Sequence, residues 1–492
     1  METRVAFKDD QQGVPHYNLY VDGQWVRSTS NETIEVENPA TEETIALIPE
    51  ANEEDVQRAL SAAQRAQPEW ARLPAVERGQ LLLKLGQAIR AHSELLAESI
   101  TREQGKLITL GRGEVEAAAK RIDYAASWCR QIEGDILPAE NPEENIYIHQ
   151  VPYGVTVGIA AWNFPIAVAA RKLGPALVTG NTMVLKPSEL TPIATLELAN
   201  IIDQVGFPPG VVNVVTGHGK TTGDLLVRNP ITRLVSLTGS VRAGREVLQA
   251  ASDNITVLRL ELGGKAPFVV MDDADIDKAV AAAMTSRFLN CGQVCTCNER
   301  MYIQSGVYDQ VVQQLLERIR NMKIGDPFKE VDLGPKISRA EVEKIDQRVQ
   351  SAVSAGAEVL TGGHPLRDGE FSRGHWFQPT LVSGVEQSMD LMREETFGPV
   401  LPVAKFDEFE DALQMANDTS YGLSAYLFSN DMRRIMRVVR DFNFGEIYVN
   451  RQLGEAVQGF HTGHGLSGMG GEDGKYGVEG FLQKRTVYLN YS

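Results

Sequence analysis

Cysteine is scarce in this sequence, with 4 residues in a chain of 492. So few cysteines cannot form the disulfide framework of a secreted domain, and we expect a protein of a reducing compartment, the cytoplasm. Cys291, Cys295 and Cys297 lie close together, but their C-x3-C-x-C spacing lacks the paired C-x2-C of zinc sites and has no histidine nearby. The sequence therefore predicts no metal site.

Positive charge is also in short supply. The chain has 48 Lys and Arg against 65 Asp and Glu, a formal net charge of -17, and shows no basic cluster of the kind that binds nucleic acid. Residues 1–10 carry charges where a signal peptide has its apolar core. The uncharged stretch 150–170 contains Asn163 and Pro165, which argues against a membrane span. We expect neither nucleic acid nor a membrane as a partner.

Apolar residues make up 43% of the sequence and charged residues 23%, the balance of a globular protein. The length predicts two or three domains. From residue 155 onward short apolar runs alternate with helical segments, and the runs are typical of buried strands at 155–160, 183–186, 211–215, 234–237 and 257–260. This spacing leaves room for crossover helices and predicts an α/β fold with a doubly wound, Rossmann-like domain.

A second alternation begins after Gly263 and predicts a second α/β domain. Its expected strands lie at 268–271, at 301–303 and near Val359, Thr380 and Leu401, and its helices at 275–289, 307–322 and 339–355. Nearer the N-terminus, Asp22-Gly23 indicates a hairpin within 20–26, and Asn38-Pro-Ala-Thr41 separates a further pair of short strands. The helical pattern of 51–129 predicts helices that pack over a sheet.

The segment 131–151 has the alternation of a strand pair that leaves the main body. We predict that the alternating tail at 486–491 pairs with it near Ile146. Exposed strand edges of this kind are commonly covered by another subunit. The sequence therefore predicts a homo-oligomer, either a dimer or a tetramer.

Two candidate chemical groups follow the predicted strands, where a doubly wound sheet binds its ligand. Glu261 ends an apolar run and Cys295 lies in a glycine-containing loop, so the chain offers a base and a nucleophile for covalent acyl chemistry. Taken alone, Glu261 could be an ordinary surface carboxylate and Cys295 an ordinary buried thiol. The amide of Asn163, just before Pro165, suits an oxyanion hole or a helix cap, and both interpretations stay open.

Two turns suit a nucleotide. Lys186-Pro-Ser-Glu189 follows a predicted strand and offers a cation and a carboxylate to ribose hydroxyls, although a solvated turn explains it equally well. Thr238-Gly-Ser240, with Gly244 behind it, opens a helix whose free N–H groups suit a pyrophosphate. It is not the usual G-x-G-x-x-G pattern.

Six motifs together resemble the aldehyde dehydrogenase superfamily in order and spacing, over essentially the whole chain. Any one of them would be weak evidence, whereas all of them in register are highly specific. They are Trp162-Asn-Phe-Pro165, Lys186-Pro-Ser-Glu189, Thr238-Gly-Ser240 with Gly244, Glu261-Leu-Gly-Gly264, Gly292-Gln-Val-Cys295 and Glu394-Glu-Thr-Phe-Gly-Pro399.

The resemblance implies NAD-dependent oxidation of an aldehyde to the free acid. Cys295 would be the nucleophile, and Cys291 and Cys297 packing residues. The amide of Asn163 and the backbone N–H of Cys295 would hold the oxyanion of the thiohemiacetal before hydride passes to the nicotinamide. Glu261 would then activate water to hydrolyse the thioester; members that acylate coenzyme A usually lack this base.

The resemblance also implies the cofactor contacts and the roles of the domains. Because the carboxylate of Glu189 would repel a 2′-phosphate, NAD is favoured over NADP. Lys172 and Glu472 match positions associated with proton relay. Residues 1–131 and 153–262 would form the NAD-binding domain, 263–479 the catalytic domain, and 132–152 with 480–492 a small β oligomerisation flap. The residues implied to contact the cofactor are Trp162, Lys186, Ser188, Glu189, Gly219, Gly239, Ser240, Gly244, Leu262, Glu395 and Phe397.

The substrate side departs from the commonest family pattern. Arg171, Glu455 and His461 take positions that are often apolar or aromatic in the family, whereas Thr296, a further candidate for substrate contact beside the nucleophile, is at a position expected to vary. Buried polar groups need partners, so they imply a polar ligand or pairing with each other. The pattern resembles bacterial lactaldehyde and glycolaldehyde dehydrogenases and favours a small hydroxyaldehyde. A semialdehyde whose far carboxylate pairs with Arg171 is the nearest alternative.

Two other function classes stay open at this point. The chain could be a catalytically silent member that acts as a binding protein, although it retains Cys295, Glu261 and Asn163. It could also be a thiol hydrolase without redox chemistry, which would not bind NAD.

Overall fold

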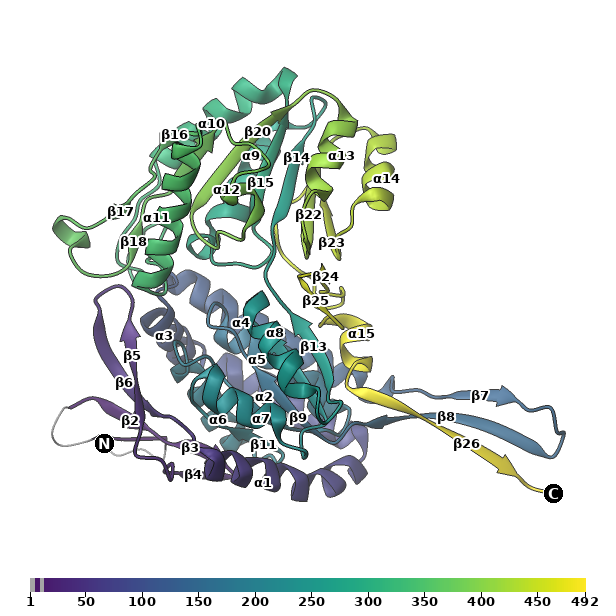
Figure 1. The fold of residues 1–492 in the computed structure, drawn as a ribbon. Helices are drawn as coiled ribbons and strands as arrows, with labels where there is room; N and C mark the ends of the chain where they lie inside the picture. The colour runs from purple at the N-terminus through teal and green to yellow at the C-terminus, as the bar shows by residue number, and fades with distance from the viewer. Residues whose placement is uncertain (1–4, 9–12) are drawn as a thin grey trace.

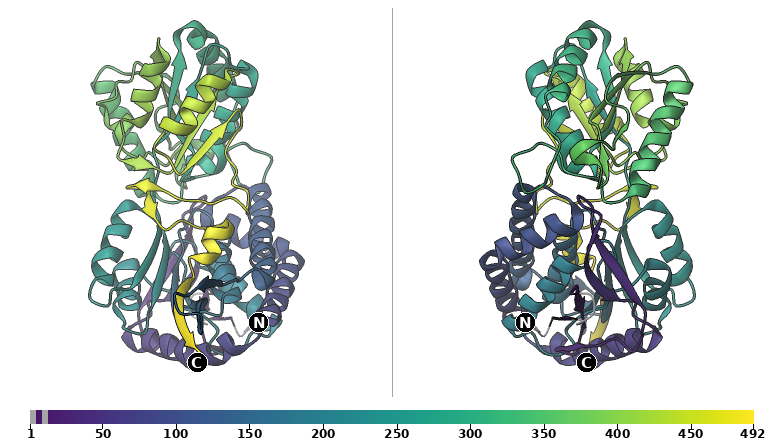
Figure 2. Two further views of the ribbon diagram at one scale, coloured as in Figure 1. Left: turned by 90° about the vertical axis from the view of Figure 1, so that its right-hand side faces the viewer. Right: turned by 90° about the vertical axis from the view of Figure 1, so that its left-hand side faces the viewer.

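The computed structural model describes residues 5–8 and 13–492, and shows two α/β lobes joined by a narrow middle with an arm that projects from one of them (Figure 1). Side views show the waist between the lobes (Figure 2). Both predicted α/β units are present. Among the described residues, no helix has both the length and the apolar character needed to cross a membrane.

The first lobe is built on an eight-stranded sheet of order β25-β13-β12-β9-β10-β11-β3-β4. Its five central strands are parallel, as predicted: β9 (Val155–Ile159), β10 (Thr182–Lys186), β11 (Val212–Val214), β12 (Leu234–Thr238) and β13 (Val257–Glu261). Strand order reverses between β9 and β12, which places a ligand crevice at their carboxyl ends. The predicted hairpin is β3 (Leu19–Val21) and β4 (Gln24–Val26).

Helices cover both faces of this sheet. One face carries α5 (Pro165–Val178) and α6 (Ile193–Val205), and the other carries α1 (Glu53–Arg72), α7 (Asp224–Arg228) and α8 (Val241–Ala251). The helices predicted within 51–129 are present, but only α1 packs on the sheet. The others form a further layer over α5 and α6: α2 (Ala75–Ala91), α3 (Ser93–Gln104) and α4 (Ile108–Ser127).

A four-stranded sheet of order β1-β2-β6-β5 lies beside the first lobe. Its strands are β1 (Ala6–Lys8), β2 (Pro15–Tyr17), β5 (Thr33–Asn38) and β6 (Glu43–Pro49). The pair β5 and β6 is the one predicted around Asn38-Pro-Ala-Thr41.

The second lobe has a seven-stranded sheet of order β16-β19-β20-β15-β14-β22-β23, parallel except for β16. The strands are β14 (Ala266–Val270), β15 (Asn298–Gln304), β16 (Glu358–Thr361), β19 (Thr380–Ser383), β20 (Val400–Phe406), β22 (Ser424–Phe428) and β23 (Glu446–Val449). Its helices are α9 (Ile276–Phe288), α10 (Tyr308–Arg320), α11 (Arg339–Ser354), α12 (Asp390–Arg393), α13 (Phe409–Asn417) and α14 (Met432–Asp441). A small hairpin joins β17 (Pro365–Leu366) and β18 (Trp376–Phe377).

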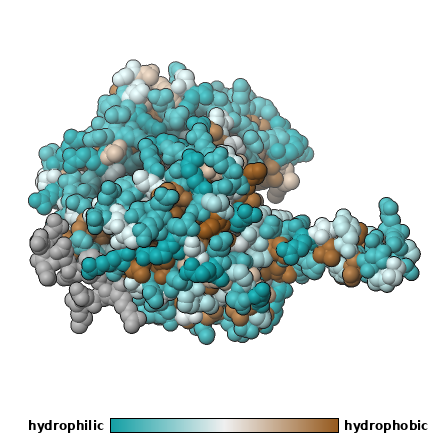
Figure 3. All heavy atoms as spheres, turned by 60° about the horizontal axis from the view of Figure 1, so that its bottom comes forward, coloured by the Kyte–Doolittle hydropathy of each residue, from teal (hydrophilic) through white to brown (hydrophobic). Residues whose placement is uncertain are grey.

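The arm is a three-stranded antiparallel sheet of β7 (Asp135–Pro138), β8 (Glu144–Pro152) and β26 (Leu482–Asn490). Ile146 pairs with Tyr488, so the predicted pairing of the tail is confirmed. Its surface carries exposed apolar side chains, seen as brown atoms on the projection (Figure 3).

Beyond β23 the chain returns to the first lobe. β24 (His464–Gly465) pairs with β21 (Tyr421–Gly422), and β25 (Gly468–Met469) joins the first sheet beside β13. α15 (Gly474–Glu479) then packs against α5. This return segment, which the sequence prediction placed with the second unit, therefore adds side chains to the crevice of the first.

Candidate active site

A cavity of about 720 Å³ opens at the carboxyl ends of β9, β10 and β12, facing the second lobe. It joins most of the residues singled out in the sequence, from both lobes. Those that line it are Trp162, Asn163, Lys186, Ser188, Glu189, Gly219, Gly239, Ser240, Glu261, Leu262, Cys295, Glu395 and Phe397. Gly244 does not; a Cβ at this position would lie 2.6 Å from Leu262, so it lets α8 pack closely under the cavity wall.

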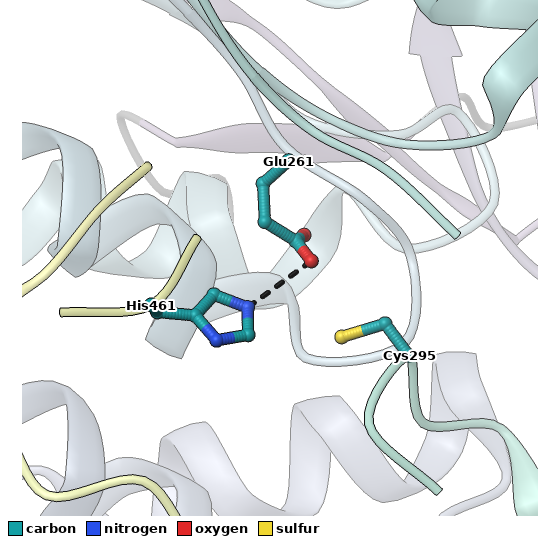
Figure 4. A group of neighbouring side chains, drawn as sticks. All are labelled: Glu261, Cys295 and His461. Carbon is teal, nitrogen blue, oxygen red and sulfur yellow. Dashed lines mark hydrogen bonds and ion pairs between the residues drawn. The ribbon is translucent and has the colours of Figure 1, made fainter. Parts of the chain in front are cut away.

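Glu261 and Cys295 line this cavity, and His461 lies beside them (Figure 4). His461 Nε2 lies 3.1 Å from Glu261 Oε1, and the Cys295 sulfur, a His461 nitrogen and a Glu261 oxygen all lie within 4.8 Å of one another. Glu261 is held at the end of β13, Cys295 lies in the loop before β15, and His461 comes from the return segment. The predicted base and nucleophile are therefore brought together, with a histidine that had been predicted only for substrate.

The loop of Cys295 is shaped by left-handed backbone. Asn290, Cys291 and Gly292 have φ of 50°, 56° and 72°. A Cβ at Gly292 would lie 2.3 Å from the carbonyl oxygen of Gly398, so only glycine fits there. Cys291 and Cys297 are buried, at 3% and 1% exposure. Burial raises the pKa of the Cys295 thiol, the charge of Glu261 raises it further, and a hydrogen bond to His461 opposes them.

Asn163 points toward the loop of Cys295. Its Nδ2 donates to the carbonyl of Gln293 at 3.1 Å, while α5 begins at Pro165 with Phe164 as N-cap residue. Of the two interpretations left open, the helix cap is thereby removed. The N–H groups of Ile166 and of the next residue instead donate to the buried carboxylate of Glu114, which sequence reasoning missed.

One end of the cavity carries Lys186 and Glu189, which form an ion pair that the sequence did not predict. Lys186 Nζ lies 3.6 Å from Glu189 Oε2, and Lys186 is buried whereas the Glu189 side chain is 31% exposed. Ser240 caps α8 by accepting from the N–H of Ala243 at 3.2 Å, which leaves the first turn of this helix facing the cavity.

At the opposite end, Glu395 accepts a hydrogen bond from the Gly264 N–H at 2.8 Å, and burial with the nearby charge of Glu299 raises its pKa to about 7. The ring of Phe397 meets that of Trp162 edge-on, with centroids 5.4 Å apart. Glu395 and Phe397 lie in one turn before β20, and this turn is strained because Phe397 has φ of 53°.

A buried carboxylate missed by sequence reasoning holds this turn. Glu299 accepts from the backbone N–H groups of Thr396 and Phe397 at 2.8 and 3.0 Å. It also pairs with Lys265 at 2.7 Å and Arg287 at 2.8 Å. Burial raises the pKa of Glu299, but these two cations more than reverse that effect, so the carboxylate is ionised and fixed. The position of the Phe397 ring therefore depends on Glu299.

Arg171 belongs to a buried network of ion pairs. This network contains more carboxylates than the sequence predicted. Arg171 Nη2 is 3.4 Å from Glu455 and 2.8 Å from Asp473. Thr296 donates to Glu455 at 3.3 Å. Burial raises the pKa of Glu455, but His461 and Arg171 outweigh it and lower it to about 2. The pairing of Arg171 with Glu455 that was left open is present, and Asp473 was not foreseen.

Lys172 and Glu472 form a second buried pair, 2.6 Å apart. Lys172 Nζ also donates to the hydroxyls of Ser236 and Thr238 at 3.1 and 2.8 Å. Burial raises the pKa of Glu472, but Lys172 and Arg171 outweigh it and lower it to about 2. A chain of polar groups thus runs from α5 to the return segment behind Glu261.

Two groups of side chains in the described part of the chain are compact enough to surround a cation, and both contain His461. One is Glu261, Cys295 and His461, and the other adds Glu446 and Glu455 to the same histidine. Hydrogen bonds and ion pairs among these groups account for their positions. We therefore assign no metal to them.

Comparison with known proteins shows which family has this sequence and fold. Residues 25–487 match the family model described as "Aldehyde dehydrogenase family". The chain belongs to the aldehyde dehydrogenase family. It is 49% identical to 3,6-anhydro-alpha-L-galactose dehydrogenase of Vibrio sp. (strain EJY3), over 96% of this chain and 99% of that protein. It is 46% identical to lactaldehyde dehydrogenase of Escherichia coli (strain K12), over 96% and 98%.

Solved structures give the same result. That of E. coli lactaldehyde dehydrogenase has a TM-score of 0.95 at 46% identity, with 97% of this chain and 99% of that chain covered. A 3,6-anhydro-L-galactose dehydrogenase in complex with NAP, which is NADP, also gives 0.95 at 48% identity, with 96% and 100% covered. Succinate-semialdehyde dehydrogenase [NADP(+)] GabD of E. coli is a more distant relative, 38% identical over 95% of this chain and 97% of that protein.

This aldehyde dehydrogenase is therefore an oxidoreductase that acts on aldehydes, and the family uses a nicotinamide cofactor. The residues present fit such a cofactor. The cavity is large, lies at the switch point of a doubly wound sheet and has a helix N-terminus on its wall. Its lining includes the candidate nucleophile Cys295.

Proposed function

We propose that this aldehyde dehydrogenase oxidises a small hydroxyaldehyde of the lactaldehyde or glycolaldehyde type to the carboxylic acid, with NAD as cofactor. The observation that carries the proposal is the polar character of the buried groups around Cys295, where His461 and Glu455 offer hydrogen-bonding groups to a hydroxylated substrate. The similarity to E. coli lactaldehyde dehydrogenase supports the same substrate class.

In the mechanism that we propose, the Cys295 sulfur attacks the aldehyde carbon and forms a thiohemiacetal. The Asn163 amide, 3.1 Å from the Gln293 carbonyl in the absence of substrate, and the Cys295 N–H donate to the oxyanion. What the bound cofactor supplies is oxidation, by accepting a hydride from the substrate carbon. Glu261 then removes a proton from the water that attacks the thioester, and the free acid leaves Cys295. The pair of Lys172 and Glu472 passes that proton away from Glu261.

Glu189 supports NAD as the preferred cofactor. Its carboxylate stands at the cavity end that carries the ribose-binding turn, where it can accept from both ribose hydroxyls and would repel a 2′-phosphate. The solved relative with NAP and the NADP-dependent relative GabD show that both forms of the cofactor occur among similar proteins. Lys186 and Ser188 beside Glu189 could serve a phosphate, so the preference depends on this one carboxylate.

A semialdehyde dehydrogenase is the second candidate, favoured by Arg171 and by the similarity to GabD. A distal carboxylate needs a cation that is free to bind it. Arg171 is already matched by Asp473 at 2.8 Å and Glu455 at 3.4 Å, and Glu472 lies 3.9 Å away. These acids reduce the attraction for a second carboxylate, so we rank the hydroxyaldehyde first.

We also propose roles for the larger parts of the fold. Residues 1–131 and 153–262 bind the cofactor, 263–479 carry the nucleophile and most of the substrate pocket, and the arm of 132–152 and 480–492 joins subunits of a dimer or tetramer. The arm has two free edges, β7 and β26. It also exposes Ile136 (71%) and Tyr488 (70%), side chains that a partner subunit would bury.

The test of this function is a comparison of kcat/KM for lactaldehyde, glycolaldehyde, succinate semialdehyde and a long aliphatic aldehyde, each with NAD. We expect the two hydroxyaldehydes to have the highest values and Arg171→Ala to lower them, because the variant leaves Asp473 and Glu455 without their cation. Arg112→Ala removes an exposed, ion-paired arginine and serves as control. An aliphatic preference that Arg171→Ala leaves unchanged would refute the polar pocket.

A second measurement tests the nucleophile. Cys295→Ser should abolish NADH formation with every aldehyde while NAD binding, followed by fluorescence quenching, stays as in the wild type. Cys129→Ser changes a thiol far along the sequence from the cavity residues and should keep full activity. If Cys295→Ser keeps more than a few per cent of the turnover, the assignment of Cys295 is wrong.

A further inference from the structure

His461 is placed between the candidate nucleophile and a carboxylate that the mechanism does not use. Its Nε2 faces Glu261 and Cys295, and its Nδ1 lies 3.2 Å from Oε1 of Glu446, the first residue of β23. The Glu446 carboxylate also accepts from the hydroxyl of Tyr448 at 2.9 Å. Carboxylate, imidazole and thiol thus follow one another from the second lobe into the cavity.

Backbone pairing fixes the position of His461 on the chain's return to the first lobe. His461 is 1% exposed, and its main chain pairs with that of Glu472 through an N–H to carbonyl bond of 2.9 Å. The ring itself is held by its burial and by the carboxylates of Glu261 and Glu446 on its two nitrogens. A histidine that merely filled space would not need a carboxylate on each side of the ring.

The charges around the ring favour its protonated form. Five groups face it from every element packed against it: Glu261 on β13, Cys295 in its loop, Glu446 on β23, Glu455 in the loop after β23, and Arg171 on α5. Burial and Arg171 lower the pKa of His461, but Glu446, Cys295 and Glu261 more than reverse this, and the pKa stands well above its ordinary value. Three carboxylates against one guanidinium leave the site short of positive charge.

We propose that His461, oriented by Glu446, is a catalytic residue: its imidazolium is the counter-ion against which the Cys295 thiol ionises. The inference rests on the proposed function only in that Cys295 is the nucleophile. Glu446 is a positioning residue, because it acts through the ring of His461.

The step balances without any co-reactant. The S–H bond of Cys295 breaks, its proton goes to the Glu261 carboxylate, and the electron pair stays on sulfur. The Nε2–H of His461, which donates to Glu261 before this transfer, then donates to the thiolate, because one N–H serves one strong acceptor and Glu261 has become neutral. The sulfur next forms its bond to the aldehyde carbon as the carbonyl π pair moves to oxygen. Glu261 then gives up the proton it took from Cys295, through the pair of Lys172 and Glu472, and is again a carboxylate when water attacks the thioester.

The experiment is alkylation of the enzyme by iodoacetamide as a function of pH, without aldehyde or cofactor. Only the thiolate reacts, so the midpoint of the rate profile between about pH 6 and pH 10 reports its ionisation. We expect His461→Gln to move the midpoint up by about one unit or more, since an adjacent cation is lost. Glu446→Gln should move it the same way by less. Peptide mapping, with Cys295→Ser as reference, assigns the signal to Cys295.

Two controls separate this role from a structural or substrate-binding one. His464→Gln changes an exposed histidine of the same segment and should leave the midpoint unchanged. Imidazole added to His461→Ala should restore part of the alkylation rate at neutral pH, because it can occupy the space of the missing ring. A midpoint that is unchanged in Glu446→Gln and in His461→Gln would overturn the proposal, and Glu446→Gln alone decides it if His461→Gln does not fold. Turnover that survives Cys295→Ser would instead refute the proposed function.

Discussion

The choice of cofactor should depend on Glu189, and replacing this residue gives a quantitative test. Its side chain is 31% exposed and 3.6 Å from Lys186 Nζ at the lip of the cavity. In Glu189→Gln the amide can still bond to ribose hydroxyls, so NAD binding changes little. What disappears is the negative charge that faces a 2′-phosphate, and Lys186 is freed to bind that phosphate.

The size of the effect follows from Coulomb's law. A 2′-phosphate of charge about -1.5 to -2, held roughly 5 Å from the carboxylate at an effective dielectric constant of roughly 40 to 80, is repelled by about 1–3 kcal/mol. We use this range of dielectric constants because the carboxylate is partly exposed. The ratio of kcat/KM for NAD to that for NADP should therefore fall by roughly 10- to 100-fold in Glu189→Gln.

The assay is the rate of reduced cofactor formation at 340 nm with one hydroxyaldehyde and varied NAD or NADP, at low and at high salt. Glu246→Gln is the matched control, because it removes an exposed carboxylate from the wall of the same cavity. Glu246→Gln should change the ratio of kcat/KM for NAD to that for NADP by less than Glu189→Gln does, and this change should vanish at high salt. A ratio that changes less than about twofold in Glu189→Gln would refute the electrostatic reasoning.

Three further outcomes are expected. Glu261→Gln should lower steady-state turnover more than it slows the pre-steady-state burst of NADH, because the Cys295 thiol can also lose its proton to solvent whereas hydrolysis of the thioester depends on Glu261; a burst slowed as much as turnover would contradict this order. Glu299→Gln should lower the free energy of unfolding by about 3–5 kcal/mol and raise the KM for NAD, since it leaves Lys265 buried without its anion, and differential scanning fluorimetry with the exposed Glu330→Gln as control checks it. The pKa of Glu472 is lowered to about 2, so its pairing with Lys172 stabilises the fold above about pH 4.5 and is lost as the pH falls toward 2. The Tm of Glu472→Gln should therefore approach that of the wild type with decreasing pH, and a constant gap would contradict the pairing.

Local patterns in the sequence predict most of the fold. Runs such as 183–186 and 234–237 are short, apolar and followed by helical spacing, so strand, crossover and sheet polarity follow from them. The same reasoning predicts that Cys295 and the turns at 186–189 and 238–240 lie at one edge of the sheet, and all of them line one cavity. The prediction was less complete for the second lobe, because β22 and β23 were not predicted. In the first sheet β25 was also not predicted, because its two residues are too few to show any periodicity.

What could not be predicted are the contacts made across long stretches of chain. The hydrogen bond of His461 to Glu261 joins residues 200 positions apart. Glu299 lies in a strand where a carboxylate reads as a surface residue, yet it is buried because two cations from other elements meet it there. Asp473 follows Glu472 in a glycine-rich loop that carries no helical or strand pattern. Which buried charges pair depends on the tertiary fold, so the spacing of residues in the sequence does not predict it.

The return of the chain to the first sheet has a consequence for how the enzyme is made. During synthesis the residues that line the cavity, of which Phe397 is the last in the sequence, leave the ribosome before 461–472, so the cavity can form while the groups behind Glu261 are still missing. The walls of the cavity are therefore made before the thiol of Cys295 gains the imidazole of His461 and before Lys172 gains the carboxylate of Glu472. The same threading means that the two lobes cannot be exchanged between relatives with a single crossover. A chimaera must carry β25 and its flanking loop with the first lobe, or Glu261 loses its backbone partner at Gly468.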